Sequence, residues 1–139
     1  MRQSIRSWLA AAWVMGVGCA SGLAAAHHSA AMFDQQQKQT LTGTVRQFQW
    51  SNPHCYIQLV VRNAQGRDEE WSFEMGAPMY LYNRGWRPST VKAGDRLKVT
   101  FSPLRKGGLG GLLVEALSAD GRPLGKQAGH AGGPGVPAP

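Results

Sequence analysis

The sequence predicts a small, mostly β fold: a five-stranded OB-like β-barrel with one short helix between the third and fourth strands. Three observations predict it. Five segments after residue 40 alternate apolar and polar residues, turn residues separate these segments, and a proline-initiated segment follows the third. An OB barrel with a coiled first strand has this order of elements, and a small open β-sandwich is the alternative.

The first strand is expected to begin at Leu41 and to be strongly bent. Its apolar parity runs from Leu41 to Val45 and then slips by one residue to Phe48 and Trp50. Such a slip requires a β-bulge or a sharp bend, and Gly43 suits a bent strand.

The second and third strands are expected to form an antiparallel hairpin. Residues 55–62 alternate most regularly, and residues 63–66 read Asn-Ala-Gln-Gly, a turn in which the glycine can adopt positive φ. Residues 71–75 form the return strand, which places Trp71 and Phe73 on the inner face.

Pro78 predicts the first turn of a short helix that continues to about Arg84 and stops at Gly85. After a turn, residues 97–101 alternate as the fourth strand, which Pro103 ends. Residues 106–111 are expected to be a flexible glycine-rich loop, with the fifth strand at 112–117.

The chain begins like an exported protein. Arg2 and Arg6 precede an uncharged apolar segment at 8–23, and three alanines at 24–26 resemble a cleavage site. We therefore expect residues 1–26 to be a cleaved signal peptide and the mature protein to be periplasmic. The segment is too short and too diluted by glycine for a membrane span, and a lipoprotein signal at Cys19 is the alternative.

The mature chain divides into three parts. We expect an N-terminal arm at 27–39, the OB-like barrel domain at 40–124 and a disordered Gly/Pro/Ala-rich tail at 125–139.

Composition limits the function. Removal of residues 1–26 leaves thirteen Lys and Arg against eight Asp and Glu, a net charge of +5. These charges form no basic stripe, which argues against a nucleic-acid partner.

Cys55 is the single cysteine of the mature chain, so no internal disulfide is expected, and its register with Ile57 and Leu59 predicts a buried thiol.

No enzymatic motif is present. The mature sequence lacks a nucleophile elbow, a phosphate-binding loop with Gly-Lys-Ser/Thr and a dinucleotide-binding fingerprint. His54 and Cys55 are adjacent on a strand, so they face opposite sides and do not form a nucleophile–base pair.

Histidines are the candidate metal ligands. Cleavage after Ala26 gives His27 a free α-amine, and His28 and His54 can complete a nitrogen-rich site for copper or another transition metal. The alternatives are a chance His pair and adventitious copper binding. His130 lies in the tail and is expected to be unstructured.

Aromatic residues give a second candidate site. Tyr56 faces the less apolar side of the second strand, on the surface that OB barrels often use for binding. Tyr56, Trp50, Glu74 and Arg87 are the candidate ligand-binding residues, and ordinary surface packing is the alternative.

Several segments also resemble a known family. His-His-Ser at 27–29, Met-Phe-Asp at 32–34, Leu-Thr-Gly-Thr-Val at 41–45 and Asn-Pro-His at 52–54 resemble a family of small exported bacterial proteins of unknown function. The resemblance covers about residues 27–122. It implies one site at the three histidines, with Glu74, Trp50 and Arg87 around it. A looser similarity to periplasmic bacterial OB-fold proteins implies ligand binding more than catalysis.

Together these features predict an exported, periplasmic OB-like binding module that is not an enzyme and that binds copper or another transition metal through His27, His28 and His54. The alternatives are a module that binds an envelope protein or a small ligand without metal and, least favoured, a copper-dependent oxidant.

Overall fold

The computed structural model describes residues 31–126 and residue 129. The chain separates into two compact units, Met1–Ala31 and Met32–Pro139, and the second contains the folded domain. Its elements are β1 (Gln39–Gln49), β2 (Tyr56–Arg62), β3 (Asp68–Glu74), α3 (Pro78–Tyr82), β4 (Arg96–Pro103) and β5 (Gly110–Ser118). Within the described residues, no helix is long and apolar enough to cross a lipid bilayer.

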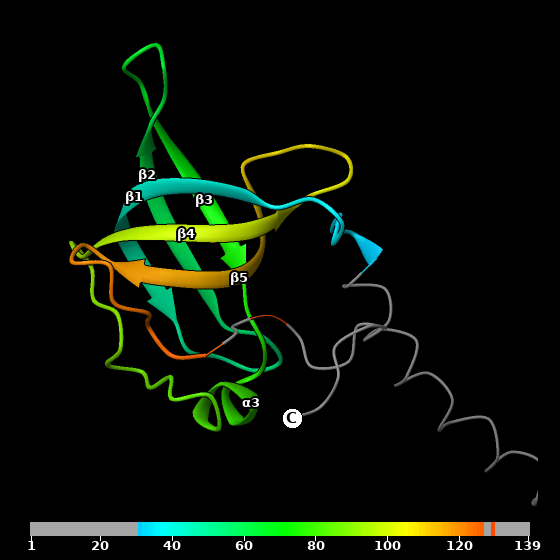
Figure 1. Cartoon of the computed structure of the whole chain (residues 1–139), viewed down its shortest axis with the longest axis vertical. Coiled ribbons are helices and arrows are strands. Elements are labelled where there is room, and N and C mark those ends of the chain that lie inside the picture. The colour runs from blue at the N-terminus through cyan, green and yellow to red at the C-terminus, as the bar shows by residue number, and fades with distance from the viewer. Residues whose placement is uncertain (1–30, 127–128, 130–139) are drawn as a thin grey trace, which may run out of the picture. The chain divides into compact units, whose positions relative to one another are not determined.

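The five strands form a closed barrel in the order β1-β2-β3-β5-β4, as Figure 1 shows. All neighbouring pairs are antiparallel except β3 and β5, which are parallel. The helix lies between β3 and β4 in sequence. The predicted OB-like fold is therefore confirmed.

Strand β1 closes the barrel because it pairs with two neighbours in succession. Residues 39–44 pair with β4, and residues 44–49 pair with β2. The register shifts between Val45 and Gln47, so Arg46 is an extra residue and the predicted β-bulge is confirmed. Gly43 lies so close to β2 that a methyl group there would be 2.8 Å from the carbonyl oxygen of Val60.

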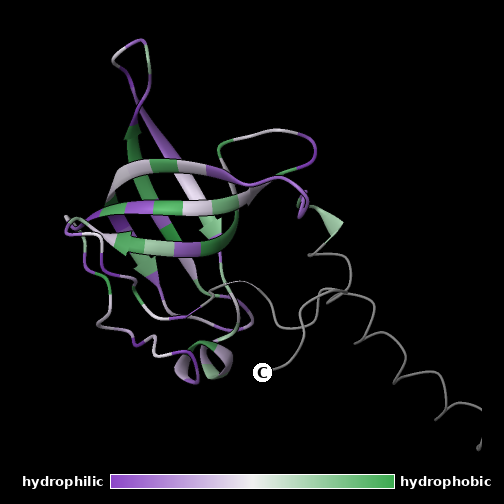
Figure 2. Ribbon diagram, in the orientation of Figure 1, coloured by the Kyte–Doolittle hydropathy of each residue, from purple (hydrophilic) through white to green (hydrophobic). Residues whose placement is uncertain are grey.

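The interior is filled by alternate residues of all five strands. Hydrophobic and hydrophilic residues alternate visibly along β4 in Figure 2. The buried core includes Val45, Cys55, Ile57, Leu59, Phe73, Met75, Leu81, Trp86, Val91, Leu97, Val99, Phe101, Leu113 and Ala116. Since these side chains face inward, Tyr56 and Glu74 face outward from β2 and β3.

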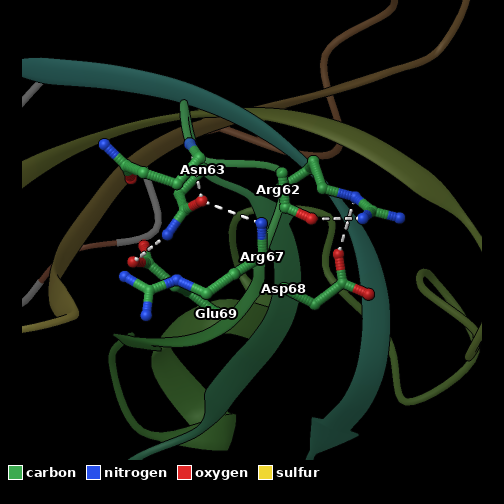
Figure 3. A network of polar contacts seen from close by, with 7 residues as sticks. Arg62, Asn63, Arg67, Asp68 and Glu69 are labelled. Atoms are coloured by element: carbon green, nitrogen blue, oxygen red, sulfur yellow. Dashed lines mark hydrogen bonds and ion pairs between the residues drawn. The ribbon is translucent and has the colours of Figure 1, made fainter.

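The turn between β2 and β3 has the predicted hairpin residues and is held by side chains (Figure 3). The Asn63 side-chain oxygen accepts hydrogen bonds from the backbone N–H groups of Gln65 and Arg67, at 3.0 and 2.9 Å. The Asn63 amide donates to Glu69 at 2.8 Å, and Arg62 forms an ion pair with Asp68 at 3.0 Å. Gly66 has φ of 74°, as the turn requires.

Several element boundaries differ from the prediction: β1 begins at Gln39 and β3 at Asp68, each before its expected start, and the helix and β5 differ as well. The helix ends at Tyr82, because Trp86 N–H donates back to the carbonyl oxygen of Leu81 and the chain turns away through Gly85. Gly110 and Gly111, which were expected in a flexible loop, are the first two residues of β5.

The arm before β1 is fastened to the end of β4. Phe33 is only 3% exposed and forms a β-bridge with Leu104. Asp34 N–H donates to the carbonyl oxygen of Pro103 at 2.8 Å, and Arg105 N–H donates to that of Met32 at 2.9 Å. The polar composition of this segment did not predict these contacts.

Candidate functional site

His54 and Glu74 form a close polar contact on the outside of the barrel. The Nδ1 atom of His54 lies 2.8 Å from Oε1 of Glu74, and the two side chains are 21% and 13% exposed. His54 belongs to the loop between β1 and β2, whereas Glu74 is the last residue of β3. The fold therefore brings together two candidate residues that are twenty positions apart in the sequence.

Tyr56 extends this contact into a three-residue group. Tyr56 is the direct strand partner of Glu74, and its hydroxyl donates to Oε2 of Glu74 at 3.3 Å. One carboxylate thus accepts from a phenol on one oxygen and contacts an imidazole with the other. Burial, followed by the nearby Glu74 charge and the hydrogen bond to it, raises the pKa of Tyr56 above its usual value of 10.0.

The raised pKa of Tyr56 predicts a loss of stability in strong alkali. Since the folded state holds this proton more tightly, its stabilising contribution is complete below pH 10 and is lost as the pH rises through the folded-state pKa. Denaturant unfolding above pH 10 should show a steeper decline in stability for the parent than for Tyr56→Phe. Equal declines in the two proteins would contradict the assignment.

The loop that carries His54 is held by its own residues and by β3. The hydroxyl of Ser51 donates to the carbonyl oxygen of His54 at 3.0 Å, and the Asn52–Pro53 peptide bond is cis. Cys55 N–H donates to the carbonyl oxygen of Gly76 at 3.1 Å, just beyond Glu74. These hydrogen bonds hold the backbone of His54 in position relative to the end of β3.

Trp50 and Arg87, the other two candidates, meet at Tyr82. The Trp50 and Tyr82 rings are edge-to-face with centroids 5.2 Å apart, and the Arg87 guanidinium lies 4.8 Å from the Tyr82 ring centroid. Arg87 also donates to the carbonyl oxygens of Tyr82 and Trp86 at 2.9 and 2.7 Å. Sequence reasoning missed Tyr82 because its position at the end of a five-residue helix gives no periodic signal.

The residues that directly follow His54 and Glu74 in the sequence are both sulfur-containing, and both lie inside the barrel. Cys55 and Met75 are fully buried, and burial raises the pKa of the Cys55 thiol. The prediction of a buried cysteine is confirmed. A cation on the outer face would therefore meet nitrogen and oxygen donors here.

His27 and His28 lie outside the described residues, as do the predicted signal peptide and most of the predicted tail. Among residues 31–126 and 129, no three His, Cys, Asp or Glu side chains are grouped closely enough to hold a metal ion. Of the described residues, His54 and Glu74 are the two of these types that come together here, which is fewer than such a group requires.

A sequence model described as a family of unknown function (DUF6152) matches residues 14–114. This match includes the loop of His54 and the whole of β2 and β3. Neither a curated protein nor a solved structure matches the chain.

Proposed function

The chain belongs to the DUF6152 family, whose function is unknown, and we propose that it is an exported binding module for a transition-metal cation, copper(II) in the first place. The ligands we propose are His54 together with His27 and His28. The observation that carries this proposal is the 2.8 Å contact between Nδ1 of His54 and the carboxylate of Glu74.

This contact orients the imidazole as in a metal site. An ionised carboxylate only accepts hydrogen bonds, so in neutral His54 the proton belongs on Nδ1 and the lone pair on Nε2. Histidines that bind metals commonly donate their other N–H to a carboxylate, which fixes the ring and makes it a better ligand. Glu74 therefore supports His54 in the role of a ligand through Nε2.

The fastening of the arm supports the inclusion of the amino-terminal histidines. Phe33 pairs with the end of β4, β4 neighbours β5 and β5 neighbours β3, so about 14 Å of strand spacing separates Phe33 from the strand of Glu74. His28 precedes Phe33 by five residues, and an extended chain of that length spans about 17 Å. The arm is thus of the same scale as this spacing, which supports the inclusion of His28 and His27 among the proposed ligands.

Export would complete the donor set. Cleavage after Ala26 places the new α-amine on His27, next to that residue's own imidazole. An amine and imidazoles are the borderline nitrogen donors that copper(II) prefers in a tetragonal arrangement. The proposal therefore includes both the periplasmic location and the cleavage site.

The test uses protein exported with its own leader, its amino terminus verified by intact mass and titrated with copper(II) alone. We expect a one-to-one, nitrogen-rich site by electron paramagnetic resonance in the parent, and a weaker site with fewer nitrogens in His54→Ala. His54→Gln is the matched variant, because its amide can still donate to Glu74 but cannot ligate as an imidazole. Binding that is identical in all three proteins would overturn the proposal.

An alternative function, binding of a small ligand or an envelope protein without metal, is supported by the position of Arg87. The structure gives this guanidinium no carboxylate partner among the described residues, although Tyr82 and two carbonyl groups hold it in place. A positioned guanidinium beside aromatic rings suits an anionic organic ligand or an acidic segment of an envelope protein. Loss of partner binding in Arg87→Ala, but not in His54→Ala, would favour this function over metal binding.

A further inference from the structure

Helix α3 carries exposed apolar side chains outside the barrel, at the end of the domain opposite the β2–β3 turn (Figure 1). Leu81 anchors the helix in the core, whereas Met79 is 80% exposed and Tyr82 is 44% exposed. Met79 and Tyr82 are three positions apart, so their side chains are neighbours on one face of the helix. Two of the four large apolar side chains that are exposed in the described part of the chain therefore lie together on a five-residue helix.

Two arginines lie on aromatic rings of the same helix. The Arg84 guanidinium is 3.6 Å from the centroid of the Tyr80 ring, and that of Arg87 is 4.8 Å from the centroid of the Tyr82 ring. Residues 75–94 include no Asp or Glu, and neither guanidinium forms an ion pair with any described carboxylate. The α3 surface, defined as Met79, Tyr80, Tyr82, Arg84 and Arg87, is therefore both apolar and positively charged.

The chain after β5 brings a third cation to this surface. The backbone N–H of Lys126 donates to the carbonyl oxygen of Arg84 at 2.8 Å, and its carbonyl oxygen accepts from Nε1 of Trp86 at 3.3 Å. Further along, Gly129 lies against β5, where a methyl group would be 3.2 Å from the carbonyl oxygen of Leu113. Lys126 is exposed and forms no ion pair within residues 31–126. Its backbone is fixed beside Arg84, which adds positive charge next to the α3 surface.

We propose that the α3 surface docks on an anionic lipid bilayer, with Met79 and Tyr82 in the interfacial layer and the cations at the lipid headgroups. Exposed apolar and aromatic side chains combined with Arg and Lys are typical of segments that lie in the membrane interface. The long stems of Arg and Lys keep their charged ends in water while apolar neighbours are buried. The inference goes beyond the proposed metal site and does not depend on it.

The exposure of Met79 favours a bilayer over an acidic protein segment. With four-fifths of its surface in solvent, this side chain projects from the domain. A fluid bilayer buries a projecting apolar side chain without needing a matching pocket, and that burial is favourable. An acidic segment would neutralise Arg84 and Arg87 but would leave Met79 in water.

The test measures co-sedimentation with vesicles of phosphatidylethanolamine and phosphatidylglycerol, and with neutral vesicles of phosphatidylcholine alone. All proteins are exported with the same leader, so they share one amino terminus. We expect the parent to bind the anionic vesicles, less so as salt is added, and to bind the neutral vesicles much more weakly. Met79→Asp should weaken binding to the anionic vesicles about tenfold, and Arg84→Gln should weaken it about fivefold.

Matched controls introduce the same changes elsewhere on the domain. Leu109→Asp places the same charge at another exposed apolar residue, in the loop before β5, and Arg96→Gln removes an exposed cation from β4. Both should bind nearly as the parent does. A second measurement uses spin-labelled lipid, which should broaden the methyl signal of Met79 and not that of Met32, an exposed methionine in the arm before β1.

The outcomes are distinct from those of the copper experiment. His54→Ala should bind both kinds of vesicle as the parent does. Equal binding to the two kinds of vesicle, or binding to neither, would overturn the proposal, and so would a loss in Met79→Asp no larger than that in Leu109→Asp. If Arg84→Gln weakens binding and Met79→Asp does not, the cations attract headgroups without insertion, and the proposal is overturned in favour of an acidic protein segment as the partner.

Discussion

Replacement of Gly111 by alanine is expected to lower the free energy of unfolding by about 3 kcal/mol. A methyl group at this position would overlap the carbonyl oxygen of Ser102 and would lie 2.6 Å from Cδ2 of Phe101. Neither neighbour can move easily, because Ser102 is held in the β4–β5 pairing and Phe101 is a fully buried core ring. The change should be measured by denaturant unfolding of the full chain.

Gly107 provides a matched control in the same glycine-rich segment. No atom lies within 4 Å of a methyl group placed there, but its φ is +75°. Gly107→Ala should therefore lower the free energy of unfolding only by the cost of placing alanine in a left-handed conformation, about 1 kcal/mol. A loss for Gly111→Ala no larger than that for Gly107→Ala would mean that β4 moves aside readily, and that its close approach does not explain why position 111 is a glycine.

Alternation of apolar residues predicted the barrel because each strand has one face inside it. The residues from Cys55 to Leu59 show this most clearly, and the parity slip between Val45 and Phe48 predicted the bulge that the structure has at Arg46. The start of β5 was missed because Gly110 and Gly111 have no side chains to alternate. Their reason for being glycine, close approach to β3 and β4, exists only in the closed barrel.

The candidate site was predictable in its residues but not in its contacts. The sequence suggested His54, Tyr56 and Glu74 as candidates, yet their grouping depends on the β2–β3 register and on the path of the β1–β2 loop. Nothing in the polar arm or in the Gly/Pro/Ala tail indicated that Phe33 and Gly129 contact the barrel. Those contacts depend on surfaces that only the folded strands create.

Removal of the Glu74 carboxylate is expected to weaken copper(II) binding by about 10- to 100-fold. Glu74→Ala leaves every proposed ligand in place and removes the acceptor that orients the His54 ring. The imidazole would then sample other orientations, and its Nε2 lone pair would be a weaker donor. Glu74→Gln should fall between the parent and Glu74→Ala, because an amide oxygen can still accept from Nδ1–H but carries no charge.

The control for this prediction must separate orientation from charge. Glu115 on β5 is exposed, so Glu115→Ala removes the same negative charge from the outer surface without touching His54. If long-range attraction of the cation explained the role of Glu74, both alanine variants would weaken binding alike. A loss confined to Glu74→Ala, with copper titration and denaturant unfolding measured on the same samples, would mean that the carboxylate acts through the imidazole beside it. Unchanged affinity in Glu74→Ala would contradict the proposal, because it would mean that the contact between Glu74 and His54 plays no part in metal binding.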